Sequence, residues 1–386
     1  MNIEKLRQQF FILFDEPEQL PEVYFAPGRV NLIGEHTDYN GGFVLPCALQ
    51  LGTWLLIRKR KDHLLRFASG NQEFRADILL EKANQPIAKS WVNYPLGVFD
   101  QFRQHQIPLQ GFDMYFSGDI PNGAGLSSSA SIEMVTAFAL NDLLGAGLEM
   151  IDLVKWSQRA ENEFVGVNCG IMDQFAVGMG EKDHAIFLNC LSLEHRPVPF
   201  KLDGYRLIVA NTNKVRGLAD SKYNERVAEC QLAVTYLSDQ FGVHKLGQIS
   251  FMQFFKIQDI IPDEVIRKRA RHVISEDQRV LNAISALSKY DIMQFGALMN
   301  ASHESLRDNY EVTGPELDTL VEEAWKINGV IGARMTGAGF GGCTVNIVRE
   351  DAVDRFLNEV GAAYFARTKL VPEFYMAQVS GGVRKH

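Results

Sequence analysis

Residues 121–131 read Pro-Asn-Gly-Ala-Gly-Leu-Ser-Ser-Ser-Ala-Ser, a glycine- and serine-rich stretch between two apolar runs. The run before it, residues 112–117, has the alternation and the aromatic side chains of a strand. The run after it repeats apolar residues at helical spacing, and Gly145 follows where a helix can stop. The repeating residues are Ile132, Val135, Ala139 and Leu143. The stretch therefore predicts a strand, a glycine loop and a helix in succession.

A loop of this kind suits a phosphate group. Free backbone N–H groups and the positive end of the helix dipole point at whatever fills the loop. The serine hydroxyls can reach phosphate oxygens or a magnesium ion. The loop is not a Walker A motif, because no lysine lies between Gly123 and Ser131, and it lacks the three spaced glycines of a dinucleotide fingerprint. The alternative is an ordinary serine-rich turn that caps a buried helix.

The overall composition is that of an ordinary globular protein with room for two or three domains. Of its 386 residues 46% are hydrophobic and 22% are charged. The net charge of −8 argues against a general nucleic-acid binder and against attraction to anionic membranes. Five cysteines without a Cys-x-x-Cys pair suit reduced thiols. With no secretory signal or membrane-spanning stretch in the sequence, we expect a cytoplasmic protein.

A second polar cluster lies near the start of the chain. Arg29, Glu35, His36 and Asp38 stand between apolar runs, and the turn at residues 40–42 follows them. Two carboxylates, an imidazole and a guanidinium can exchange hydrogen bonds with several sugar hydroxyls at once. The alternative, a surface ion-pair cluster, is disfavoured by the apolar runs on both sides.

The rest of the chain predicts a mixture of strands and helices. Short apolar runs predict strands at residues 43–45, 51–58, 64–68, 74–80, 205–210 and 344–348. Helical spacing predicts helices at residues 3–14, 91–104, 150–164, 171–177 and 215–238. A new domain is expected to begin at about residue 200, which divides the chain into residues 1–200 and 201–386.

Three further segments carry weaker signals. The basic run at residues 267–272 is flanked by acidic residues and predicts a solvated helix face. Residues 313–316 resemble a capping box that opens a helix. The glycine run at residues 332–343 allows close approach of backbone to backbone or ligand, or else marks bulges within a sheet.

Two carboxylates, Asp173 and Glu161, lie in predicted helices, where each also has a purely structural explanation. Asp173 falls in the first turn of a predicted helix, where the dipole favours the ionised form but where aspartates are common for stability alone. Its apolar neighbours favour a place on the wall of a cleft. Glu161 falls near the C-terminal end of the helix predicted at residues 150–164, where a lone glutamate is usually solvated.

Three sequence blocks together are more specific than any one of them. Residues 28–40 resemble the galactokinase signature. Residues 123–131 are similar to the phosphate-loop motif of the wider superfamily of galactokinase, homoserine kinase, mevalonate kinase and phosphomevalonate kinase, and residues 337–342 to its third motif. The resemblance implies a two-domain α+β fold. It also implies mixed and antiparallel sheets packed with helices, and an active site in the cleft between the domains.

The resemblance also implies roles for individual residues. Asp173 is similar to the family's catalytic base and Arg29 to its partner. The positions similar to the sugar-binding set are Glu35, His36, Thr37, Asp38, Gly170 and Tyr223. Those similar to nucleotide-binding positions are Ser69, Trp91, Gly123, Ala124, Gly125, Leu126, Ser127, Ser128 and Ser129. The positions similar to the magnesium ligands are Ser129 and Glu161.

The activity that the resemblance implies is magnesium-dependent transfer of the γ-phosphoryl group of ATP to the C1 hydroxyl of D-galactose, with no obligate protein partner. One alternative is an N-acetylgalactosamine kinase, which needs space beside C2 of the sugar. Another is a non-catalytic sensor of galactose and ATP, which the complete serine loop and the presence of Asp173 and Arg29 disfavour. A nucleic-acid-binding protein is disfavoured by the acidic charge balance.

Overall fold

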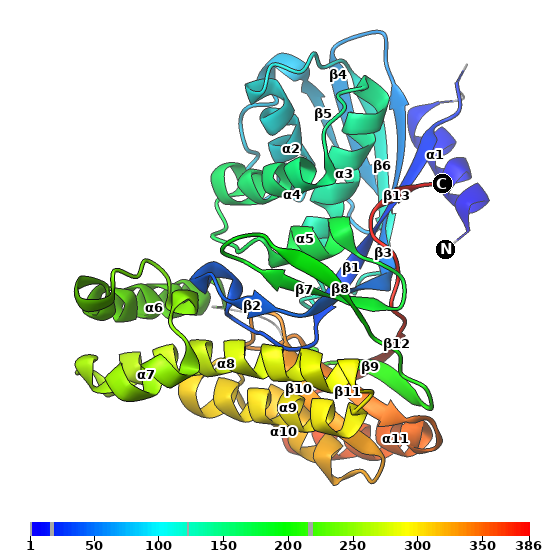
Figure 1. Ribbon diagram of the computed structural model, residues 1–386. Helices are drawn as coiled ribbons and strands as arrows, with labels where there is room; N and C mark the ends of the chain where they lie inside the picture. The colour runs from blue at the N-terminus through cyan, green and yellow to red at the C-terminus, as the bar shows by residue number, and fades with distance from the viewer. Residues whose placement is uncertain (1, 16–18, 122, 215–218) are drawn as a thin grey trace.

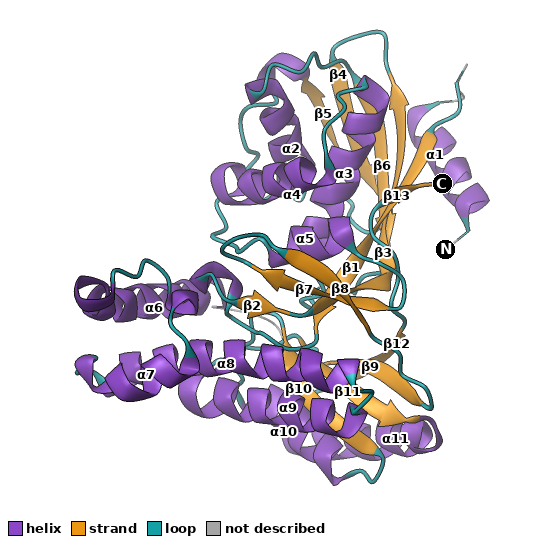
Figure 2. Ribbon diagram, in the orientation of Figure 1, coloured by secondary structure: helices purple, strands orange, loops and turns teal. Residues whose placement is uncertain are grey.

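A six-stranded mixed sheet forms the core of the first half of the chain (Figure 2). The computed structural model describes residues 2–15, 19–121, 123–214 and 219–386. The strand order is β13-β1-β3-β6-β4-β5, in which β4 pairs with β6 in parallel and the other neighbours are antiparallel. The strands are β1 (Glu22–Asn31), β3 (Pro46–Lys59), β4 (Leu64–Ser69), β5 (Ala76–Leu79), β6 (Phe112–Gly118) and β13 (Arg384–Lys385).

Helices lie on both faces of this sheet because side chains of one strand alternate between the faces (Figure 1). On β1, Tyr24 and Ala26 belong to the core beneath helices α2 to α5, whereas Val23 packs with α1 on the opposite face. An apolar strand of this kind needs a cover on both sides. The helices are α1 (Ile3–Phe14), α2 (Asn93–Gln104), α3 (Ser128–Leu144), α4 (Met150–Arg159) and α5 (Met172–Met179).

A four-stranded antiparallel sheet organises much of the second half. Its order is β10-β11-β9-β12, with β9 (Tyr205–Asn211), β10 (Val330–Thr336), β11 (Cys343–Arg349) and β12 (Glu373–Ala377). Ile208 and Ala210 face the core under α10 (Pro315–Lys326) and α11 (Val353–Thr368). Leu207 and Val209 face the other way, toward α8 (Glu264–Ser288) and α9 (Ile292–Ser305).

A small sheet and a group of helices complete the fold. The strands β2 (Phe43–Val44), β7 (His184–Asn189) and β8 (His195–Pro199) pair in that order beside α8. Helices α6 (Ala219–Phe241) and α7 (Phe251–Ile257) pack against α8 at the left of Figure 1. The short helices are η1 (Asp38–Asn40), η2 (Leu80–Lys82), η3 (Ala160–Val165), η4 (Leu246–Gln248), η5 (Gln258–Ile260), η6 (Leu306–Tyr310) and η7 (Glu350–Ala352).

The two halves of the chain are interleaved. Strand β13, at residues 384–385, pairs with β1 in the first sheet, and α8 of the second half packs against β2 of the first. We therefore propose that the boundary between the two domains lies at about residue 200. Strand β13 is an exception, since it belongs to the sheet of the first half. No helix among the described residues combines the length and the apolar character needed to cross a membrane.

Most of the predicted elements are confirmed, with ends that shift by a few residues. The helix predicted at residues 3–14 has those bounds, and the strand predicted at residues 112–117 extends to Gly118. The α+β fold class is confirmed as well, with mixed and antiparallel sheets packed with helices. Two predictions reach beyond the described part of the chain: Asn122 of the glycine loop, and residues 215–218 at the start of the helix predicted at 215–238.

Two sequence interpretations are wrong. The basic run at residues 267–272 is not a solvated face, because Arg269 and His272 are buried where α8 packs against α6 and η6. Residues 313–316 do not form a capping box. The N-cap of α10 is Gly314, which has no side chain to accept a hydrogen bond, and Pro315 opens the helix instead.

A buried aspartate joins three strands of the large sheet. Asp113 on β6 accepts hydrogen bonds from Arg58 on β3, Arg60 beyond its end and Arg66 on β4. Arg58 also donates to the backbone oxygen of Phe14, which ties α1 to the cluster. Burial by itself raises the pKa of Asp113, but the hydrogen bonds from the three guanidinium groups outweigh it and hold the pKa below its ordinary value.

We predict that Asp113→Asn lowers the free energy of unfolding at pH 7 by about 2–4 kcal/mol, because three guanidinium groups lose their shared counter-charge. An aspartate whose pKa is depressed by folding stabilises the protein above its unfolded pKa of about 3.9. The difference between wild type and variant should therefore shrink as the pH falls below about 4. Urea unfolding at several pH values measures it, and a difference that is absent at pH 7 contradicts the prediction.

Candidate active site

Six segments of the chain meet around one cavity of about 350 Å³. They are the end of β1 with the turn after it, the start of α2, the glycine-serine loop before α3, the stretch from η3 to the start of α5, the start of α6, and the loop after β10. A cavity of this size can hold a small-molecule ligand. The predicted site residues that line it are Arg29, Glu35, His36, Asp38, Gly123, Gly125, Ser127, Ser128, Ser129, Glu161, Gly170, Asp173 and Tyr223.

A bidentate ion pair joins β1 to α5. Arg29 Nε and Nη2 donate to the two carboxylate oxygens of Asp173 over 2.8 and 2.7 Å, which fixes the plane of the carboxylate. Arg29 Nη1 donates to the backbone oxygen of Gly125 over 2.8 Å, so the pair is also tied to the glycine-serine loop. Ser127 Oγ donates a further hydrogen bond to Asp173. Asp173 stands in the first turn of α5, as predicted, and lines the cavity.

The glycine-serine loop turns sharply before α3. Gly123, Gly125 and Ser127 have φ values of +70°, +75° and +62°, in the left-handed region that favours glycine. The side chains of Ala124 and Leu126 are buried in the core and anchor the loop from behind. Because α3 begins directly after Ser127, the positive end of its dipole faces the cavity.

Glu161 is buried, contrary to the solvated position usual for a lone helical glutamate. It lies in the π-helical turn η3, where the wider turn changes which side chains face the core. Gln174 Nε2 donates to Glu161 over 2.6 Å and to Glu133 over 3.0 Å. Burial and the charge of Asp173 raise the pKa of Glu161, while a hydrogen bond with Ser129 opposes the rise.

This group of side chains has the chemistry of a site for a hard cation. Among the described residues, no three His, Cys, Asp or Glu side chains are placed to hold a metal by themselves. Ser129 and Glu161 nevertheless supply a hydroxyl and a carboxylate at the glycine-serine loop, and one buried oxygen of Glu133 has no hydrogen-bond partner in the described structure. The residues therefore fit a magnesium ion that takes its other ligands from phosphate and water.

Polar side chains of residues 28–40 face the same cavity, and the pKa values of His36 and Asp38 are shifted there. Burial, helped by the neighbouring His272, lowers the pKa of His36 to about 3, so its ring is neutral at physiological pH. Burial and the nearby charge of Asp173 raise the pKa of Asp38 to about 7. Perturbed groups gathered in one cavity are typical of functional sites.

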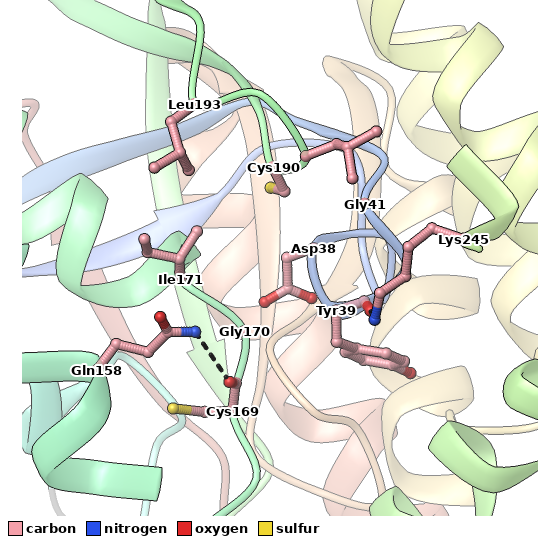
Figure 3. Close-up of a pocket in the computed structure, with 11 residues that line it drawn as sticks. Asp38, Tyr39, Gly41, Gln158, Cys169, Gly170, Ile171, Cys190, Leu193 and Lys245 are labelled. Atoms are coloured by element: carbon pink, nitrogen blue, oxygen red, sulfur yellow. Dashed lines mark hydrogen bonds between the residues drawn. The ribbon is translucent and has the colours of Figure 1, made fainter. Parts of the chain in front are cut away.

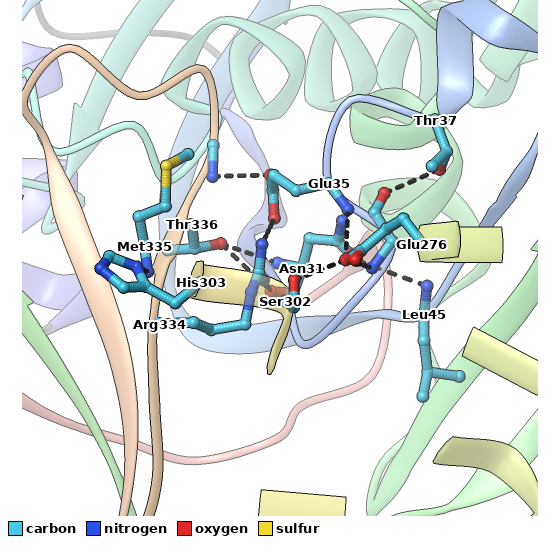
Figure 4. A network of polar contacts seen from close by, with 12 residues as sticks. Asn31, Glu35, Thr37, Leu45, Glu276, Ser302, His303, Arg334, Met335 and Thr336 are labelled. Atoms are coloured by element: carbon cyan, nitrogen blue, oxygen red, sulfur yellow. Dashed lines mark hydrogen bonds and ion pairs between the residues drawn. The ribbon is translucent and has the colours of Figure 1, made fainter. Parts of the chain in front are cut away.

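Glu35 is held by an ion pair that crosses between the halves of the chain (Figure 4). Arg334 on β10 donates to Glu35 Oε2 over 2.6 Å and to the backbone oxygen of Asn31 over 2.8 Å. The N–H of Gly337 donates to Glu35 Oε1 over 2.7 Å. Burial raises the pKa of Glu35, and the charges of Arg334 and Arg29 oppose the rise. These bonds attach the glycine motif at residues 337–342 to the signature at residues 28–40.

Sequence reasoning missed several residues that shape this site. Arg334 is one, although a basic residue directly before the glycine motif is a signal that could have found it. Glu276 is another: it accepts hydrogen bonds from the backbone N–H groups of Gly34 and Glu35, yet nothing in its helical sequence context distinguishes it. Tyr94 also lines the cavity and was not predicted.

Five predicted site residues do not line the main cavity: Ala124 and Leu126, whose side chains are buried in the core, and Thr37, Ser69 and Trp91. The hydroxyl of Thr37 donates to the backbone oxygens of Gly34 and Phe43, so it stabilises the turn after β1. Ser69 and Trp91 line a second cavity of about 150 Å³. The two cavities share Tyr94, Ser128 and Ser129. The second cavity is therefore an extension past the start of α3.

A side pocket of about 280 Å³ opens beside Asp38 (Figure 3). It shares Asp38, Tyr39, Cys169 and Gly170 with the main cavity. Gly170 packs so closely against Asp38 that a Cβ atom on it would lie 1.9 Å from Asp38 Oδ2. Glycine at this position is therefore required for the observed placement of the carboxylate.

The fold and the glycine-serine loop with its aspartate–arginine pair define a small-molecule kinase of the GHMP class. Residues 93–181 match the family model of the GHMP kinases N terminal domain, and residues 283–366 that of the GHMP kinases C terminal domain. A solved mevalonate kinase is similar in fold, with a TM-score of 0.66 and 20% identity over 93% of this chain and 99% of that one.

More specific similarities narrow the class to one family. Residues 8–59 match the galactokinase galactose-binding signature. Galactokinases of Clostridium beijerinckii and Streptococcus thermophilus are 50% and 49% identical, each over 100% of this chain and 99% of the relative. The crystal structure of Lactococcus lactis galactokinase complexed with galactose is similar with a TM-score of 0.97 and 41% identity, covering 100% of both chains. The chain belongs to the galactokinase family.

We predict that Gly170→Ala weakens galactose binding by a factor of about ten or more, because its Cβ displaces Asp38, which we propose below as a ligand of the sugar. Isothermal titration with galactose measures the change. Gly381→Ala is the matched control, since a Cβ there meets no atom within 4 Å. Equal galactose affinity in both variants contradicts the prediction.

Proposed function

We propose that this chain transfers the γ-phosphoryl group of ATP to the C1 hydroxyl of D-galactose, giving galactose 1-phosphate and ADP. The observation that carries the proposal is the Arg29–Asp173 pair, which lies in one cavity between the polar turn after β1 and the glycine-serine loop. A sugar held by the turn and a triphosphate held by the loop would meet at this pair. Positioning and charge stabilisation supply most of the rate in phosphoryl transfer.

Asp173 is proposed as the base that takes the proton of the C1 hydroxyl. Its carboxylate lines the cavity, and Arg29 and Ser127 hold it in one orientation by hydrogen bonds. Arg29 would then have a second role, in which its positive charge stabilises the negative charge that develops on the transferring phosphoryl group. A general base in this position contributes a factor of about 10²–10⁴ to the rate.

The sugar-binding set is proposed as Glu35, His36, Asp38, Gly170 and Tyr223, all of which line the main cavity. Carboxylates accept hydrogen bonds from sugar hydroxyls, and the faces of aromatic rings cover the apolar C–H groups of a sugar. Thr37 supports this set through the backbone of the turn and does not itself face the cavity.

The nucleotide is proposed to bind across both cavities. Backbone N–H groups of residues 123–129 would surround its phosphates in the main cavity. The adenosine is proposed to bind in the second cavity, which adjoins the main cavity at Ser128 and Ser129 and is lined by the aromatic ring of Trp91 and by Ser69. Ser129 and Glu161 would hold Mg²⁺, which when bound offsets the negative charge of the phosphate oxygens.

We further propose that the enzyme works in the cytoplasm without an obligate protein partner. The five cysteines lie as free thiols, which suits a reducing compartment. ATP and galactose are then its two ligands.

The function is tested by coupled ADP release across a panel of free hexoses, with and without magnesium. We expect ADP release that needs both galactose and magnesium and is weak with glucose and mannose. Stronger release with N-acetylgalactosamine than with galactose would replace the proposed substrate. Binding of galactose and ATP without ADP release would identify a sensor in place of an enzyme.

Asp173→Asn is expected to lower kcat by a factor of about 10²–10⁴, because an amide cannot take the proton. The affinity for ADP should remain that of the wild type, since the glycine-serine loop is unchanged. Asp152→Asn is the matched control: Asp152 occupies the first turn of α4, as Asp173 does in α5, but does not line the cavity. Near-normal turnover of Asp173→Asn removes that residue from the base role.

A further inference from the structure

We propose that Gln174 is a positioning residue for the magnesium site, because it holds the carboxylate of Glu161 in the orientation in which that group binds the cation. The inference rests on the magnesium ligands of the proposed function, Ser129 and Glu161. Gln174 is fully buried and does not line the cavity, so it acts through Glu161 and not through a contact with a substrate.

The side chain of Gln174 lies between two buried carboxylates. Its Nε2 donates over 2.6 Å to Glu161 Oε2 and over 3.0 Å to Glu133 Oε2. An amide nitrogen carries two N–H groups, so each carboxylate receives one of them. The three side chains therefore form a continuous polar bridge that runs from α3 through α5 to η3.

The direction of the bond to Glu161 follows from the chemistry of a cation site. A carboxylate that holds Mg²⁺ is ionised, and an ionised carboxylate only accepts hydrogen bonds. The atom of Gln174 that lies 2.6 Å from Glu161 must then be the nitrogen, because an amide oxygen in its place would face a negative charge without a proton between them. The partners of the amide thus determine which way it points.

This hydrogen bond selects the oxygen of Glu161 that is left for a cation. Cys169 Sγ lies 3.4 Å from Oε2 as well, so that oxygen is contacted from two sides. Oε1 is the oxygen that remains for a cation in the cavity, which Glu161 and Ser129 both line. Outer partners of this kind orient the carboxylates that bind metals, and losing one costs about 10- to 100-fold in metal affinity.

The place of Gln174 in the chain ties the cation site to the proposed base. Gln174 directly follows Asp173 in the first turn of α5. Successive helical residues point about 100° apart, so Asp173 reaches the ion pair with β1 while Gln174 reaches Glu161. Glu133 lies one turn of α3 after Ser129 and holds the second N–H of the amide. The base and both magnesium ligands therefore belong to one buried framework.

The inference is tested by isothermal titration of wild type and Gln174→Met with ADP and with Mg·ADP. Methionine keeps the length of the side chain but has no N–H donor. We expect the affinity for Mg·ADP to fall by about 10-fold in Gln174→Met and the affinity for metal-free ADP to stay that of the wild type. An unchanged affinity for Mg·ADP, or an equal loss for both forms of the nucleotide, overturns the inference.

Gln101→Met is the matched control for loss of a buried amide. Gln101 is also buried, but it belongs to α2 and lines neither the main nor the second cavity. We expect it to bind Mg·ADP as the wild type does. An equal loss of Mg·ADP affinity in Gln101→Met and Gln174→Met overturns the inference.

A double-mutant cycle separates positioning from general damage to the fold. Because Gln174 acts through Glu161, adding Gln174→Met to Glu161→Gln should cause almost no further loss of Mg·ADP affinity. A loss of the same size in both backgrounds overturns the inference. Gln174→Asn, whose amide is one methylene shorter, carries the test if Gln174→Met does not fold, with a loss in the same direction.

Steady-state kinetics give a second readout. The Mg²⁺ concentration for half-maximal ADP release should rise about 10-fold in Gln174→Met, while KM for galactose stays near that of the wild type. A raised KM for galactose with an unchanged Mg²⁺ requirement overturns the positioning role. If the wild type releases no ADP with galactose, the proposed function fails, while the titrations with ADP and Mg·ADP still decide the role of Gln174.

Discussion

The buried pair between Glu35 and Arg334 is the interaction on which the active-site cavity depends. Both side chains are removed from water, so their mutual attraction and their backbone hydrogen bonds must offset the loss of hydration. The pair joins the turn after β1 to the strand that leads into the third glycine motif. Without it, a buried carboxylate and a buried guanidinium would each lack a counter-charge. The cavity can therefore keep its shape only while the two halves of the chain stay together.

A concentration of negative charge follows from this arrangement. Glu35, Asp38, Glu161 and Asp173 all line the cavity, and Arg29 is the one lysine or arginine among the described residues that line it. The raised pKa of Asp38 expresses the repulsion from Asp173 as well as burial. Such a site favours ligands that present hydroxyl groups, and it needs added positive charge before a triphosphate can enter. A GHMP kinase that works on a sugar has both requirements.

The sequence predicted local features well, because neighbouring residues determine them. The glycine spacing and the apolar repeat predicted the strand, loop and helix around residue 123 correctly. The predicted start of the next helix placed Asp173 in its first turn, where the structure has it. The partner of Glu35 lies 299 residues away, and no local pattern encodes such a distance. The burial of Glu161 depends on a π-turn and on Gln174 from another helix. The solvated face predicted at residues 267–272 was wrong, because flanking acidic residues are typical of a surface helix. Arg269 is instead buried by the packing of α8 against its neighbours.

The pairing of β13 with β1 has a consequence for biosynthesis. Strand β1 leaves the ribosome long before β13, because residues 32–383 are made between them. Until β13 arrives, one edge of β1 exposes unpaired backbone groups, which are a template for association with other chains. The nascent chain thus carries an open sheet edge at Tyr24 and Phe25 while residues 32–383 are made, and shielding by a chaperone would matter most during that interval.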